Sequence, residues 1–117
     1  MTEKSKEDHL SEIVYLSPAQ RDFQQLMDFL ISNGVTLSRA REILNEVIKK
    51  LRVLENNPRL GFSFGGKYGF KTPYRGLVCG AYIVVYECIN TDKDEKGRIE
   101  IRRIYHKHED YLNQLQQ

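Results

Sequence analysis

The sequence predicts an α+β domain with an N-terminal strand, an antiparallel helical hairpin, a small antiparallel sheet of three further strands, and a short C-terminal tail or helix. Two observations predict this arrangement. Residues 74–89, YRGLVCGAYIVVYECI, are the densest run of β-branched and aromatic residues in the chain, and Gly80-Ala81 divides the run in two. The segment before it carries two apolar stripes at helical spacing.

The first predicted elements are a strand over residues 12–16 and a helix that begins at Ser17-Pro18, with Ser17 as the N-cap. Asn33-Gly34 is typical of a helix end with a left-handed residue. The helix between them has one apolar stripe, made of Phe23, Leu26, Met27, Leu30 and Ile31.

A second helix is predicted to begin near Thr36 or Ser38 and to stop at Asn56-Asn57-Pro58, because the residue before proline is pushed out of the α region. Its stripe is Ala40, Ile43, Leu44, Val47, Ile48, Leu51 and Leu54. The short link between the helices predicts an antiparallel hairpin, and we expect both stripes to pack on the sheet as core.

Residues 59–73 contain four glycines between aromatic residues and are predicted to form a loop with several turns. Aromatic side chains interleaved with lysines suit contact with bases and phosphates. The alternative is that some of the phenylalanines anchor the loop to the core.

The later strands are predicted over residues 74–79, 81–89 and 98–105. Both faces of 81–89 are apolar, with Tyr82, Val84, Tyr86 and Cys88 on one and Ile83, Val85, Glu87 and Ile89 on the other, which indicates a central strand. In 98–105, Ile104 has the opposite parity to Ile99 and Ile101. Either a bulge lies near Arg102-Arg103 or both faces are covered there. The polar tail that follows is predicted to form one short helix with Tyr111, Leu112 and Leu115 facing inward.

The 117 residues fit one domain, which we place at 12–117, after a flexible N-terminal extension at 1–11. No apolar run approaches the roughly 18 residues needed to cross a bilayer, and the charged N-terminus does not resemble a secretory signal. We therefore expect a cytoplasmic protein with no membrane partner. Cys79 and Cys88 are predicted to be two buried thiols rather than a disulfide.

The net charge is only +2, but the basic residues form two groups. The first is Lys49, Lys50, Arg52, Arg59, Lys67, Lys71 and Arg75, with Glu55 as its only acid, and the second is Arg98, Arg102, Arg103 and Lys107 beside His106 and His108. The asymmetry indicates an anionic partner, either nucleic acid or an acidic protein; the alternative is that both groups are solvated surface.

A possible P-loop and a possible metal site both lack residues that they would need. The segment GFSFGGKY at 61–68 is close to a phosphate-binding P-loop, but Tyr68 replaces the magnesium-binding hydroxyl and the segment follows a helix instead of a strand. His106, His108 and Asp110 lack a distant Cys/His pair that would complete a metal site. No metal or cofactor is expected, and acid–base chemistry is the more plausible use of the histidines.

Four segments in order resemble the RelE/ParE superfamily of bacterial type II toxins. They are LSPAQRDF (16–23), ENNPRLG (55–61), YRGLVCGAYIVVYE (74–87) and IEIRRIYHKHEDY (99–111). The resemblance covers residues 12–112 and implies the same strand, hairpin and sheet order.

The resemblance implies two unlike mechanisms. RelE-like toxins cut mRNA in the ribosomal A site, using basic side chains and a stacking aromatic to promote attack by the 2′-hydroxyl, whereas ParE-like toxins poison DNA gyrase. The central-strand arginine of RelE-like toxins falls on Ile83, and the arginine pair after the last-strand histidine is Lys107-His108. If the chain is RelE-like, the resemblance implies that Lys107, His108, Tyr111 and Arg75 are catalytic. The hairpin with its Pro-x-x-Gly exit, and the spacing of Arg75 to Tyr86, look more like ParE.

We therefore predict a toxin that arrests growth by poisoning gyrase and is neutralised by a cognate antitoxin, which would wrap the helical hairpin and cover the sheet. Residues predicted to contact the target or nucleic acid are Lys67, Lys71, Arg75, Arg103 and His106. The first alternative is a ribosome-dependent mRNA endoribonuclease. The second is a non-catalytic decayed toxin or binding module, which the missing central-strand arginine would fit.

Overall fold

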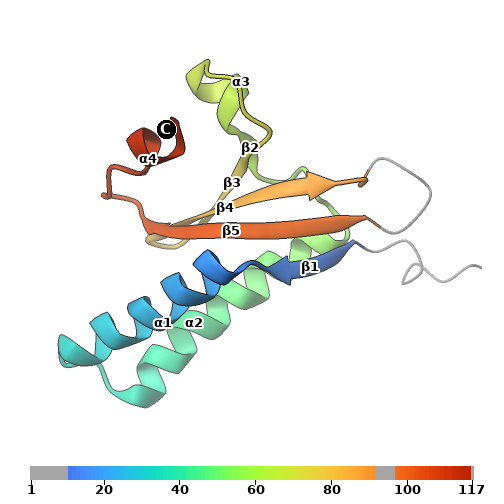
Figure 1. Cartoon of the computed structure of the whole chain (residues 1–117). Helices are drawn as coiled ribbons and strands as arrows, with labels where there is room; N and C mark the ends of the chain where they lie inside the picture. Colours follow the sequence, from blue (N-terminus) through green and yellow to red (C-terminus); the bar gives the residue numbers. More distant parts are fainter. Residues whose placement is uncertain (1–10, 92–96, 117) are drawn as a thin grey trace, which may run out of the picture.

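The computed structural model describes residues 11–91 and 97–116 (Figure 1). The elements in order are β1 (Glu12–Tyr15), α1 (Ser17–Ser32), α2 (Leu37–Leu51), the 3₁₀ helix η2 (Arg52–Glu55), β2 (Phe62–Ser63), α3 (Phe64–Tyr68), β3 (Arg75–Cys79), β4 (Tyr82–Ile89), β5 (Arg98–His106) and α4 (Tyr111–Gln116). The predicted α+β order is confirmed. The extension predicted at 1–11 lies outside the described residues except for residue 11, as does most of the polar connector before β5.

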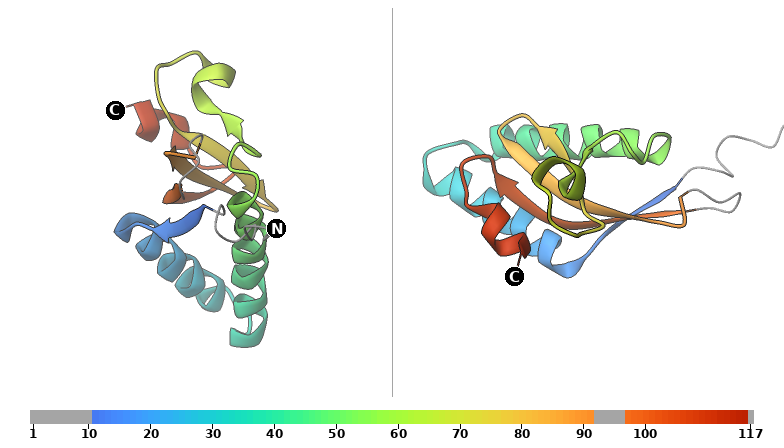
Figure 2. Two further views of the ribbon diagram at one scale, coloured as in Figure 1. Left: turned by 90° about the vertical axis from the view of Figure 1, so that its right-hand side faces the viewer. Right: turned by 90° about the horizontal axis from the view of Figure 1, so that it is seen from above.

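The sheet has five strands in the order β1-β5-β4-β3-β2, so β4 is central, as its two apolar faces predict. β1 pairs parallel with β5, and all other neighbours are antiparallel. The helical hairpin covers one side, here called the hairpin face, and α3 and α4 lie on the other side, here called the far face (Figures 1 and 2). The domain therefore has two separate cores, one on each side of a single sheet.

The start of α1 differs from the prediction. Ser17 is already helical, Leu16 is the N-cap, and no side chain caps this end, so the predicted Ser17 cap is wrong. The second start is as predicted: the Thr36 hydroxyl accepts a hydrogen bond from Arg39 N at 3.1 Å. The turn between the helices is closed by Gly34, whose φ of +88° is a conformation that glycine adopts without strain.

The hairpin face is packed with aliphatic side chains. Its buried cluster is Ala19, Val47, Leu51, Leu54, Leu77, Cys79, Val84, Tyr86, Ile99, Ile101 and Ile104. Val47, Leu51 and Leu54 of the second predicted stripe are buried here. Both stripes also keep an exposed member, because Ile31 is 44% and Ile48 37% exposed. Figure 1 shows the reason for Ile31: the end of the hairpin that carries the α1–α2 turn projects beyond the sheet, so the sheet does not cover it.

The far face is packed with aromatic side chains from distant segments. Its buried cluster is Phe64, Ile83, Val85, Tyr105 and Tyr111. Residues 59–73, predicted to be a loop, include β2 and α3. The Ser63 hydroxyl accepts a hydrogen bond from Gly66 N at 3.1 Å, and Gly69 ends the helix in the left-handed region. Phe64 is completely buried, so at least this phenylalanine anchors the segment to the core.

A β-bulge in β5 explains the parity conflict among its isoleucines. Val85 pairs with Arg103 and Tyr86 pairs with Ile101, which leaves Arg102 as the extra residue. Ile101 and Ile104 therefore both reach the hairpin-face core. Of the two explanations that the sequence left open, the bulge near Arg102-Arg103 is the one that the structure shows.

Candidate functional site

The structure does not gather the four residues that a nuclease would need. Arg75, Leu77 and Cys79 are two residues apart along β3, so their side chains share the hairpin face. Tyr111 packs on the far face. Lys107 lies at the opposite end of β3, where its N–H donates to Ala81 O at 2.9 Å. A strand of this length separates its ends by roughly 13 Å.

The Arg75 guanidinium is held by the loop that leaves the second helix. Its Nη2 donates to Gly61 O at 2.6 Å and to Arg59 O at 3.1 Å. Nearby, the Tyr86 hydroxyl donates to Pro58 O at 2.7 Å and accepts from Gly61 N at 3.0 Å. Burial raises the pKa of Tyr86 above its ordinary value, and these two hydrogen bonds satisfy the buried hydroxyl. Arg75 thus fastens the Pro-x-x-Gly exit to the sheet.

Aromatic rings cover Ile83, the position at which the resemblance to RelE-like toxins would place an arginine. The side chain is 5% exposed and packs with Phe64, Tyr105 and Tyr111. The rings of Tyr105 and Tyr111 are stacked at 5.7 Å with 24° between their planes, and Phe64 meets Tyr111 edge-on at 6.2 Å. Desolvation raises the pKa of both tyrosines. We call this group of four residues the aromatic plug.

The two histidines lie together at the end of β5. Their ring centroids are 5.1 Å apart, and His106 Nδ1 accepts a hydrogen bond from His108 N at 3.2 Å. The His106 ring also contacts Tyr82 edge-on at 5.6 Å, and His106 N donates to the Glu109 carboxylate at 2.7 Å. His106, Lys107 and His108 are therefore neighbours on one turn. Arg75 is not part of this group, and the ring of Tyr111 is buried on the far face.

Two grooves flank Tyr82, between the hairpin and the end of the sheet. The larger, about 580 Å³, lies between α1 and the end of β5 and is lined by residues that include Leu26, Phe29 and His106. The smaller, about 350 Å³, lies between α2 and the β3–β4 turn and includes Ile43 and Lys50. Both are lined by a mixture of apolar and charged side chains, which suits a protein segment.

Comparison with known proteins identifies the family. Residues 13–111 match the family described as ParE toxin of type II toxin-antitoxin system, parDE. The chain belongs to the ParE toxin family. A solved structure titled "Chromosomal ParDE TA system from P. aeruginosa" has the same fold, with a TM-score of 0.65, 13% sequence identity, and coverage of 84% of this chain and 97% of that one. A search of curated proteins found no match.

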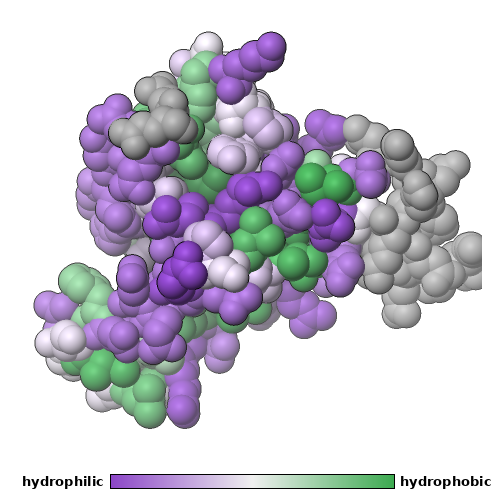
Figure 3. All heavy atoms as spheres, viewed as in Figure 1, coloured by the Kyte–Doolittle hydropathy of each residue, from purple (hydrophilic) through white to green (hydrophobic). Residues whose placement is uncertain are grey.

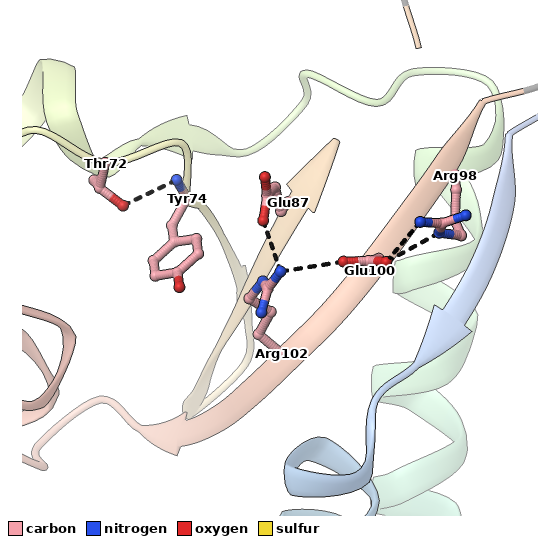
Figure 4. Close-up of polar contacts among 6 residues, drawn as sticks. All are labelled: Thr72, Tyr74, Glu87, Arg98, Glu100 and Arg102. Atoms are coloured by element: carbon pink, nitrogen blue, oxygen red, sulfur yellow. Dashed lines mark hydrogen bonds and ion pairs between the residues drawn. The ribbon is translucent and has the colours of Figure 1, made fainter. Parts of the chain in front are cut away.

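In this ParE-family chain, most of the second basic group is already paired. Arg102, the bulge residue, donates to Glu87 at 2.8 Å and to Glu100 at 3.1 Å, and Arg98 also pairs with Glu100 (Figure 4). The Arg102 guanidinium lies 5.3 Å from the Tyr74 ring centroid. Glu87 and Glu100 are directly opposite in register, so Arg102 relieves the repulsion between them.

Arg103, predicted to contact the target, is hydrogen-bonded to Asp22 on α1. Its Nε and Nη2 donate to the Asp22 carboxylate at 2.8 and 3.1 Å, and Ile104 N donates to the same carboxylate at 2.8 Å. The hydrogen bonds with Asp22 raise the pKa of Arg103. Asp22 thereby caps the edge of β5 where β1 has ended. The sequence offered no signal for this role, because the two residues are far apart in the chain.

Among the predicted contact residues, Lys67 and Lys71 remain on an exposed surface near α3. Sequence analysis missed the exposed apolar residues Phe29 and Leu37 near the hairpin turn. Within residues 11–91 and 97–116, no group of three or more metal-ligating side chains comes together, and no helix has the length and apolarity of a membrane span.

Proposed function

We propose that this protein is the toxin of a type II toxin–antitoxin module, that it arrests growth by poisoning DNA gyrase in the cytoplasm, and that a cognate antitoxin neutralises it. The observation that carries the choice of target is the aromatic plug. It fills the far-face position where a RelE-like toxin would present its arginine, and it buries Tyr111 to 9% exposure. A stacking aromatic needs an open ring face, and Tyr111 has none to offer.

The gyrase proposal is tested with purified protein and a supercoiling assay. We expect loss of supercoiling and accumulation of cleaved DNA as the protein is added, and recovery when the antitoxin is present in excess. Normal supercoiling at concentrations that arrest growth would contradict the proposal. Codon-spaced mRNA cleavage in cells that express the protein would favour the nuclease instead, and unimpaired growth would favour a decayed toxin.

The hairpin is the surface that we propose for the antitoxin. Phe29 is 62% exposed and Leu37 47% exposed, which is unusual for large apolar side chains on a helical hairpin, and Figure 3 shows hydrophobic residues gathered at this projecting end. An amphipathic helix could bury them and extend into the grooves beside Tyr82.

A matched pair of variants tests this surface. Phe29→Asp should weaken antitoxin binding by about tenfold or more, because it places a charge in an apolar contact. Leu60→Asp makes the same change at a side chain of 45% exposure outside the hairpin and should change the affinity less than about twofold. Titration calorimetry measures both, and equal losses would contradict the placement of the antitoxin.

A further inference from the structure

The segment around α3 carries basic side chains and no acidic ones. Residues 56–86 contain no aspartate or glutamate. Within them, residues 62–72, here called the α3 lobe, carry Lys67 and Lys71, both on the exposed surface. In the described part of the chain, neither ammonium has an acidic partner. In this the lobe differs from β5, whose arginines are paired with carboxylates.

The α3 lobe is anchored to the core, and the ammonium group of Lys67 is held against aromatic rings. Phe64 anchors it in the far-face core, and Phe64 N donates to Tyr74 O at 3.0 Å. The Lys67 ammonium lies 4.5 Å from the Phe62 ring centroid and 5.5 Å from that of Tyr68. These cation–π contacts restrict the side chain but do not neutralise it. Less conformational entropy is therefore lost when Lys67 meets an anion.

The chemistry of the lobe fits phosphates better than bases. Lysine is a point charge that contacts phosphate without reading sequence. Tyr68 is 37% exposed beside Lys67 and offers apolar contact to a sugar or a base. A nucleic-acid backbone presents repeated phosphates, which two lysines on one lobe can meet together.

The lobe also lies apart from the surface proposed for the antitoxin. The hairpin and α3 are on opposite sides of the sheet, as Figure 1 and the left-hand view of Figure 2 show. A partner on the lobe therefore leaves the hairpin accessible.

We propose that the α3 lobe binds the sugar–phosphate backbone of DNA through Lys67 and Lys71. The inference rests on the proposed function, because gyrase acts on DNA and a toxin on gyrase would lie close to it. The lobe would anchor the toxin to the DNA that the enzyme holds.

Fluorescence anisotropy with a labelled DNA duplex tests the lobe directly, over about 50 to 200 mM salt. Two phosphate contacts would weaken binding by about tenfold across this range, since the salt slope is about −0.9 per contact. We expect the slope to become shallower by about 0.9 in Lys67→Gln and again in Lys71→Gln. Lys49→Gln removes the same charge from an exposed site on α2 and should leave the slope unchanged. An unchanged slope in both lobe variants, an equal change in Lys49→Gln, or no binding by the unaltered protein would overturn the inference.

The supercoiling assay distinguishes its failure from that of the proposed function. We expect the Lys67→Gln, Lys71→Gln double variant to need about tenfold more protein for half-inhibition, with the antitoxin affinity unchanged. If the unaltered protein inhibits gyrase and the double variant does so equally well, the lobe inference fails alone. If the unaltered protein binds DNA with the expected slope but does not affect gyrase, the proposed function fails alone.

Discussion

The two faces of the sheet are both buried, but by different means. The hairpin face is covered by two helices of 16 and 15 residues, which contribute aliphatic side chains at regular spacing. The far face is covered by helices of only five and six residues, α3 and α4, each attached to the core through an aromatic ring. Neither short helix would be stable alone, because helices of this length do not repay the cost of nucleation.

The difference shows how one small sheet can support two kinds of surface. The hairpin is long enough to extend beyond its own core, so apolar residues near its turn remain exposed. The far face carries a strip of paired charges, Glu87, Glu100 and Arg102 (Figure 4), and, separately, the basic α3 lobe. A protein partner suits the first surface and an anionic partner suits the second.

The largest expected effect comes from removing the anchor of the far face. Phe64→Ala should lower the free energy of unfolding by about 3–5 kcal/mol, because it empties a fully buried aromatic site. It should also raise hydrogen exchange in α4, since the Phe64 ring packs against Tyr111. Chemical denaturation and exchange mass spectrometry measure the two effects.

The matched control is Leu54→Ala on the hairpin face, where an equally buried side chain is lost for about 2–5 kcal/mol. It should leave the exchange of α4 close to that of the unaltered protein, after correction for global unfolding. Equal loss of protection in α4 would mean that the two faces do not open independently.

This contrast also explains what the sequence could predict. Helical periodicity and the β-rich run identified the hairpin and the three later strands, because regular packing leaves a regular pattern. The parity conflict in β5 indicated either a bulge near Arg102-Arg103 or cover on both faces, and only the register of the strands identifies Arg102 as the extra residue. The α3 segment was missed, since one buried phenylalanine and a serine cap make no period. The site was the least predictable part: Arg75 and Arg103 were assigned to the target from charge alone, and their carbonyl and carboxylate partners come from folding.

The seam between α1 and β5 should give the next largest effect. Asp22→Ala removes three hydrogen bonds from a mostly buried carboxylate, so that Arg103 and Ile104 N lose their acceptor. We expect a loss of about 2–3 kcal/mol in the free energy of unfolding, moderated by the partial exposure of Arg103.

A surface pair of similar length provides the control for Asp22. Arg39 and Glu42 lie 3.0 Å apart, but both side chains are more than half exposed. Glu42→Ala should therefore change stability by less than about 0.5 kcal/mol in denaturant titrations. If the two variants lost similar amounts, the Asp22 contacts would be no more than ordinary surface pairing.

The smallest expected effect tests how dry the hairpin face is. Burial raises the pKa of the Cys79 thiol from its ordinary value of 9.0 to about 11, and Lys50 opposes the shift. An unfolded thiol ionises first as the pH rises, so the folded state loses stability between about pH 9 and 11 and gains none below. The loss should not exceed about 3 kcal/mol, since each pKa unit corresponds to about 1.4 kcal/mol. Cys79→Ala should remove this part of the pH slope, measured by denaturation at pH 8, 9.5 and 10.5.

Tyrosines on both faces also titrate in this range, so only the difference between the two proteins reports on Cys79. A difference of zero would mean that water reaches the thiol through the groove beside Lys50, and the aliphatic packing of the hairpin face would then be less complete than the aromatic packing of the far face.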